Sequence, residues 1–234
     1  LAAFSIIIAL GGMKVIGYTD VIQVIFLILG GLVTTYLALS RVAELNGQDG
    51  VLNGFNYMMS QSDDHFHMIL KKDNPNFPSL PGLTVLFGGM WIVNLNYWGC
   101  NQYITQRALG ADLKTARKGI LFAGFLKLGM PIIVMLPGIA AFVLYKNGQL
   151  AGFEGGKDGA YSAILAFLPA GLKGLAIAAL TAAIVASLAG KANSISTIFT
   201  LDIYKKYINK TADDKKLVVV GRWSIFVAIA VSVI

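Results

Sequence analysis

A group of four amide side chains interrupts one apolar stretch of the sequence, within the segment Gly88 to Arg107 that also contains Gln106. They are Asn94, Asn96, Asn101 and Gln102. An amide offers both hydrogen-bond donors and an acceptor, which suits a solute rich in hydroxyl groups. Tyr97 and Trp98 lie among the amides and offer flat apolar faces with a polar edge, which suits a sugar ring. The stretch therefore predicts a cavity that binds a polar solute; the alternative is hydrogen bonding between neighbouring helices.

A single lysine, Lys127, lies inside another apolar run, Gly119–Tyr145. A charge at membrane depth is costly and usually faces a partner or a watery cavity. The alternative is that its long side chain reaches back to the cytoplasmic interface. Pro131 and Pro137 follow and predict a kink in the same helix.

A possible cation site lies in a third apolar run, Gly171–Ile203, which is crowded with small residues. On a helix, the Ser187 hydroxyl falls beside the carbonyl of Ala183, one turn earlier. Oxygen groups of this kind hold hard cations, although close helix packing explains the small residues equally well. Asp20 opens a fourth run, Gly17–Ser40, where it predicts an N-terminal helix cap.

One acidic loop also holds two histidines. It contains Asp63, Asp64, His65 and His67. Because no further ligands follow at a metal-binding spacing, we expect a solvated turn rather than a metal site. The chain has no phosphate loop, no nucleophile–base pair and no dinucleotide motif, so we expect no enzyme.

The elements that position these residues are expected to be transmembrane helices. The chain is 56% hydrophobic and 13% charged, whereas a soluble domain is about one quarter charged. Apolar segments of about 20 residues can cross a hydrocarbon core of about 30 Å. Five such segments are predicted, the fifth reaching the chain end: Gly17–Ser40, Leu83–Tyr103, Gly119–Tyr145, Gly171–Ile203 and Val218–Ile234. Since the chain starts and stops inside apolar runs, we expect an internal piece of a longer protein.

The net charge of +7 comes largely from residues in the loops between the apolar segments. Lysine and arginine concentrate in loops 104–118 and 204–217, which the positive-inside rule places in the cytoplasm with Lys14. Loops 41–82 and 146–170 then lie outside. This distribution explains the charge without nucleic acid.

The long loop 41–82 is predicted to contain an outer helix, at the membrane interface or on the helix bundle. Its apolar residues fall on one helical face: Val51, Leu52, Phe55, Met58 and Met59.

Four longer motifs together resemble the solute:sodium symporter family. They are YTDVIQVIFLILGG, NLNYWGCNQYITQRALGA, KGILFAGFLKLGMPIIVMLPGIAA and NSISTIFTLDIYKKY. Within the family, the sodium/glucose cotransporter branch is the most similar, and its bacterial galactose-carrying members above all. The resemblance implies an all-α transmembrane, leucine-transporter-like bundle built from two inverted repeats. Residues 1–234 would form one partial transporter domain, with the end of the first repeat and most of the second.

The resemblance also implies roles for single residues. Asn94 and Lys127 would hydrogen-bond the sugar, and Tyr97 would stack on its ring as the inner gate, with Trp98 beside it. Asp20 matches an acidic residue that helps sodium to leave.

The sodium site implied by the resemblance uses the carbonyl of Ala183 and the hydroxyl of Ser187. The galactose-carrying members have a serine where this chain has Ala186. Members that couple two sodium ions carry hydroxyls where this chain has Ala189 and Gly190. We therefore expect one sodium site of modest affinity.

The predicted function is sodium-driven uptake of a galactose- or glucose-like sugar by a multi-pass protein of a bacterial inner (plasma) membrane. Its partners would be the sugar, the sodium ion and the lipid bilayer. One alternative is a sodium symporter for another small solute, such as a sialic acid, an inositol, an amino acid or an anion. The other is a channel or structural membrane subunit.

Overall fold

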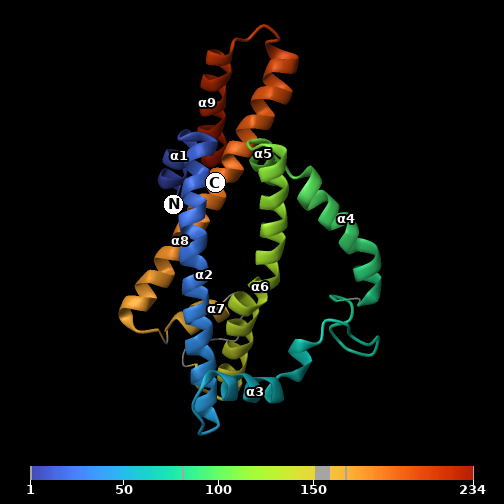
Figure 1. The fold of residues 1–234 in the computed structure, drawn as a ribbon, viewed down its shortest axis with the longest axis vertical. Helices are drawn as coiled ribbons and strands as arrows, with labels where there is room; N and C mark the ends of the chain where they lie inside the picture. The colour runs from blue at the N-terminus through green and yellow to red at the C-terminus, as the bar shows by residue number, and fades with distance from the viewer. Residues whose placement is uncertain (1, 81, 151–158, 167, 234) are drawn as a thin grey trace. The chain divides into compact units, whose positions relative to one another are not determined.

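The computed structural model describes residues 2–80, 82–150, 159–166 and 168–233, and within these ranges it contains helices and no strand (Figure 1). The α-helices are α1 (Ala2–Leu10), α2 (Gly12–Leu45), α3 (Val51–Gln61), α4 (Met90–Leu95), α5 (Gln102–Leu109), α6 (Leu113–Lys146), α7 (Ala160–Ala166), α8 (Ala170–Thr197) and α9 (Asp214–Val233). A 3₁₀ turn, η1 (Asp63–Phe66), and three π-helical segments, η2 (Val85–Gly89), η3 (Asn96–Cys100) and η5 (Ile198–Ile208), complete them.

The chain divides into two compact units. The first unit comprises residues 1–27, 96–120 and 178–234, and the second comprises residues 28–95 and 121–177. Each unit is therefore made of segments that lie far apart in the sequence.

Three described helices are long and apolar enough to cross a membrane: Gly12–Leu45, Leu113–Lys146 and Ala170–Ile208. They contain three of the five predicted spans. The last predicted span also forms a helix, α9, although it is not among the three. α6 continues through Pro131 and Pro137 as one helix.

The second predicted span, 83–103, is a broken helix, as its glycines and amides predict. It consists of η2, α4 and η3, and it stops at Asn101, whose backbone is extended (φ −79°, ψ 110°). The Asn101 side chain then accepts a hydrogen bond from the backbone N–H of Tyr103 at 3.1 Å and starts α5. A π-helical turn widens the helix, and such turns often occur at functional sites.

The prediction that Asp20 caps a helix is wrong. α2 begins at Gly12, whose φ of +76° ends the preceding helix, so Asp20 lies two turns inside α2. The Thr19 hydroxyl donates back to the carbonyls of Val15 (3.1 Å) and Ile16 (3.0 Å) instead of capping a new helix.

The second unit has an aliphatic core. Leu39, Met58 and Leu144, from α2, α3 and α6, belong to one buried cluster, and Met58 and Leu144 are fully buried. α3 comes very close to α2 at Gly54, where a Cβ would collide with the Leu39 carbonyl oxygen. This confirms the predicted helix on the bundle, although Leu52 on its predicted apolar face is 79% exposed.

The first unit packs through small residues. Ala9 of α1 and Ala189 and Ala192 of α8 form a buried cluster with Ile225 and Ile229 of α9. α9 folds back along η5, the continuation of α8 (Figure 1). Small side chains let helix backbones approach closely, so packing accounts for much of the alanine content of α8.

Candidate functional site

Asn94, Tyr97 and Trp98 of the broken span make contacts within the span itself. The Asn94 amide, at the end of α4, donates to the Met90 carbonyl of its own helix at 2.8 Å. Tyr97 and Trp98, in η3, meet edge to face, with ring centroids 5.3 Å apart and an interplanar angle of 85°. Such a geometry is favourable for aromatic pairs, so each ring restrains the other.

The four predicted sugar ligands belong to different units. Asn94 and Lys127 lie in the second unit and are exposed, whereas Tyr97 and Trp98 lie in the first. Tyr97 is 37% exposed. The joint sugar site therefore stays a prediction.

The two predicted sodium ligands on α8 share one face of the first unit. Ala183 and Ser187 are both half-buried, and Ala186 beside them is buried. Further along the helix, Ser194 donates to the Gly190 carbonyl (2.9 Å). In the part of the chain that the structure describes, the Ser187 hydroxyl has no such hydrogen bond, so its oxygen is available to a ligand.

Asp20, the third predicted sodium residue, is in an ion pair. Its Oδ2 lies 2.8 Å from Nη2 of Arg107 on α5, and the two side chains are 26% and 27% exposed. Sequence reasoning treated Arg107 only as a loop charge and missed this role. An acidic residue deep in an apolar helix requires a partner, and that requirement could have pointed to Arg107.

Arg107 also makes contacts within α5. Its Nη1 donates to the Tyr103 carbonyl at 2.6 Å, and its guanidinium lies over the Tyr103 ring, 4.1 Å from the centroid. Gly190 of α8 faces the same group. A Cβ there would lie 2.5 Å from Cε2 of Tyr103 and 2.8 Å from Nη2 of Arg107.

A second polar connection joins α5 to α8. Nε2 of Gln106 donates to the Ser194 hydroxyl at 2.8 Å, and that hydroxyl donates to the Gly190 carbonyl. α5 is thus fixed to α8 by a hydrogen-bonded chain and to α2 by an ion pair.

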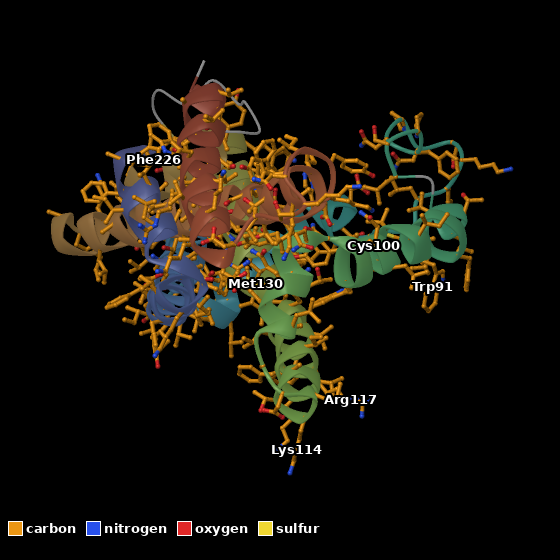
Figure 2. All side chains as sticks on the ribbon, turned by 90° about the horizontal axis from the view of Figure 1, so that it is seen from above. Trp91, Cys100, Lys114, Arg117, Met130 and Phe226 are labelled. Atoms are coloured by element: carbon orange, nitrogen blue, oxygen red, sulfur yellow. The ribbon has the colours of Figure 1, made fainter. Side chains whose placement is uncertain are left out.

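The start of α6 carries part of the basic loop. Lys114 and Arg117 project from its first turns (Figure 2). The Asp112 carboxylate caps the helix, accepting from the Thr115 hydroxyl (2.5 Å) and from the backbone N–H groups of Thr115 and Lys114 (both 3.0 Å). These bonds, that of the Thr115 side chain first, hold the pKa of Asp112 below its usual value of 3.8.

The acidic loop forms the 3₁₀ turn η1. Among the described residues, no three His, Cys, Asp or Glu side chains come close enough to hold a metal ion. His67 lies 3.3 Å from Asp63, and the His65 ring lies on Phe142, with centroids 4.5 Å apart.

Comparisons with known proteins agree on one family. The sequence profile of the Sodium:solute symporter family matches residues 1–234. The chain is 47% identical to the sodium/glucose cotransporter of Vibrio parahaemolyticus, over 99% of this chain and 45% of that protein. It is 31% identical to the human sodium/myo-inositol cotransporter 2, over 100% of this chain and 37% of that protein. It therefore spans less than half the length of these relatives.

A solved structure gives the fold. It is the substrate-bound outward-open state of a Na⁺-coupled sialic acid symporter, with a TM-score of 0.80 and 25% identity. The match covers 97% of this chain and 47% of the symporter. The predicted fold class, part of an all-α, leucine-transporter-like bundle, is thereby confirmed.

Proposed function

Because the chain belongs to the sodium:solute symporter family, we propose that it is part of a transporter that couples inward sodium movement to uptake of a galactose- or glucose-like sugar. One observation carries this proposal: 47% identity to a sodium/glucose cotransporter over 99% of the chain. Family members are integral membrane transporters and not enzymes, and the bacterial relative places the protein in the inner (plasma) membrane.

We assign the sugar to the broken span and α6. Asn94 and Lys127 hydrogen-bond the hydroxyl groups of the sugar, and the Tyr97 ring stacks on the sugar ring, with Trp98 beside it. The edge-to-face pair supports this role, because a restrained ring loses little conformational entropy when a solute binds.

We assign the coupling ion to α8. The Ala183 carbonyl and the Ser187 hydroxyl are the ligands, which are oxygen groups suited to a hard cation. Asp20 acts on the path by which sodium leaves, and its Oδ2 is paired with Arg107. A buried methyl at Ala186 leaves this site with one side-chain oxygen.

The sodium gradient can supply the required energy. One charge crossing about 100 mV releases roughly 2.3 kcal/mol, and a tenfold concentration gradient adds about 1.4 kcal/mol. The sum, roughly 3.7 kcal/mol, supports several-hundredfold accumulation of a neutral sugar. One sodium ion per sugar is therefore sufficient.

Residues 1–234 form one partial transporter domain. The family match runs through both compact units without interruption, which supports a common domain. Other parts of a longer protein would complete the sites, because the relatives are more than twice as long as the matched region.

The test is uptake by the full-length protein in proteoliposomes. Radiolabelled galactose, glucose, myo-inositol and sialic acid are offered with and without an inward sodium gradient. Sodium-dependent uptake of galactose or glucose is expected. Uptake of only myo-inositol or sialic acid would favour the alternative solutes, and sodium flux independent of any solute would favour a channel.

A further inference from the structure

We propose that Arg107 is the built-in counter-ion of Asp20 and a positioning residue that anchors α5 to α2 and α8. Four residues of the first unit form this anchor: Asp20, Tyr103, Arg107 and Gly190. α5 directly follows η3, the segment that holds Tyr97 and Trp98. The anchor therefore also restrains the position of η3. The consequence for transport rests on the proposed function, whereas the anchor itself does not.

The opposite charges of Asp20 and Arg107 compensate each other in a partly buried place. Both side chains of the Asp20–Arg107 pair are about three-quarters buried. Leaving one charge of such a pair without its partner is far more damaging than removing both. Arginine keeps its charge throughout the physiological pH range, so Asp20 is neutralised without a transported ion.

The geometry of the Arg107 guanidinium matters as well as its charge. A guanidinium presents five donors in one plane, and Arg107 uses them on two elements. One donor meets Asp20 on α2, another meets the Tyr103 carbonyl on α5, and the flat face covers the Tyr103 ring. A lysine ammonium could keep the charge but not this combination of contacts.

The space beside Gly190 is filled by this group. The guanidinium and the Tyr103 ring occupy the place where any side chain on Gly190 would begin. Only glycine at this position lets α8 approach Arg107 and Tyr103 so closely.

α5 is too short to hold its position alone. It has eight residues, and an isolated helix of that length is not stable in itself. The extended Asn101 also separates it from the hydrogen-bond ladder of η3. Its orientation therefore depends on tertiary contacts, which are the anchor and the Gln106–Ser194 bond.

The test uses the full-length protein with Cys100 as its one cysteine, any others being replaced. Cys100 is exposed at the end of η3, beside the gate residues, and is labelled in Figure 2. Its rate of reaction with a maleimide reports the position of this segment without requiring transport. Melting temperature is measured on the same samples.

Two single variants and their combination test the charge. Arg107→Gln and Asp20→Asn should each change the Cys100 labelling rate severalfold and lower the melting temperature. The double variant Asp20→Asn/Arg107→Gln should be closer to the parent protein than either single variant, because no unpaired charge remains. Additive damage in the double variant would overturn the ion-pair role. An unchanged labelling rate in Arg107→Gln would overturn the positioning role.

Two further variants test geometry and space. Arg107→Lys should recover only part of the parent labelling rate. Gly190→Ala should reproduce the effect of Arg107→Gln, whereas Gly174→Ala, on the same helix with nothing within 4 Å of the added methyl, should have no effect. Equal effects of the two glycine variants would contradict the proposed contact. If the parent protein shows no sodium-driven uptake, the proposed function fails while the labelling results still decide on the anchor.

Discussion

Each of the two units is stabilised internally by a different kind of contact. The second unit buries large aliphatic side chains, such as Leu39, Met58 and Leu144, in a continuous core. The first unit buries small alanine side chains together with two isoleucines, and it adds directed polar contacts such as the Asp20–Arg107 pair. A core of many apolar contacts tolerates the loss of one, whereas a polar contact depends on two atoms. We therefore expect the loss of one polar atom to have its largest effect on function in the first unit, and a change in side-chain volume to have its largest effect on stability in the second.

The largest expected effect is loss of sodium coupling in Ser187→Ala. The variant removes the one side-chain oxygen assigned to the ion. Uptake driven by a sodium gradient should disappear while the melting temperature stays unchanged. The control is Ser224→Ala on α9, which loses only a bond to its own helix, Ser224 to the Val220 carbonyl at 2.9 Å. Robust sodium-driven uptake in Ser187→Ala would show that the ion is placed wrongly.

The reverse change sharpens the same point. Ala186→Ser adds an oxygen beside Ser187 and should tighten sodium activation severalfold, with the Hill coefficient remaining near one. Sodium titration of initial uptake rates measures both values. A Hill coefficient near two in the parent protein would contradict the assignment of a single site.

The next largest effect is expected from the loss of the Tyr97 ring. Tyr97→Ala removes both the stacking face and the contact with Trp98, and transport should be lost. Tyr97→Phe keeps the ring and its edge-to-face geometry, so most transport should remain. Initial uptake rates at saturating sugar are the measurement. Equal rates in the alanine variant and the parent would remove Tyr97 from the site.

A smaller effect is expected from the polar sugar ligands in the second unit. Asn94→Ala and Lys127→Ala should each raise the half-saturating sugar concentration by roughly tenfold or more, as the loss of a hydrogen bond worth about 1.5–3 kcal/mol requires. Uptake is measured over a range of sugar concentrations. Reduced protein yield with unchanged sugar affinity would make both residues structural.

The core of the second unit should respond in stability. Gly54→Ala forces a methyl group against the Leu39 carbonyl and should destabilise the protein by about 1–3 kcal/mol, with a lower melting temperature. Gly124→Ala, in the same unit with nothing within 4 Å of the new methyl, is the matched control and should be neutral or slightly stabilising. Similar melting temperatures for both variants would show that α3 can move away without cost.

The smallest expected effect concerns the helix cap at Asp112. Because the folded state lowers its pKa, its contribution to stability is present above pH 3.8 and is lost as the pH falls through the folded value. Asp112→Ala should therefore lower the melting temperature slightly at neutral pH, and this difference should shrink in acid. A constant difference at all pH values would assign the effect to something other than the carboxylate charge.

The sequence predicted the helices better than the contacts. Hydrophobic runs identified the three long helices, and the glycines and amides of 83–103 identified the broken span. The start of α2 was misplaced because Asp20 is a residue type that often caps helices, whereas Gly12 with its positive φ marks the real boundary. Hydrophobic periodicity predicts which face of a helix is buried, but not which helix packs against it. Nothing in the sequence pattern therefore paired Asp20 with Arg107, which lie 87 positions apart.

The contact at Gly190 has a consequence for sequence evolution. Since a Cβ at position 190 and the guanidinium of Arg107 claim the same space, the two positions cannot vary independently. In related proteins, a larger residue at 190 should accompany a shorter side chain at 107 or a smaller ring at 103. The loss of arginine at 107 should in turn accompany an uncharged residue at 20. The anchor thus predicts a set of positions that change together through descent.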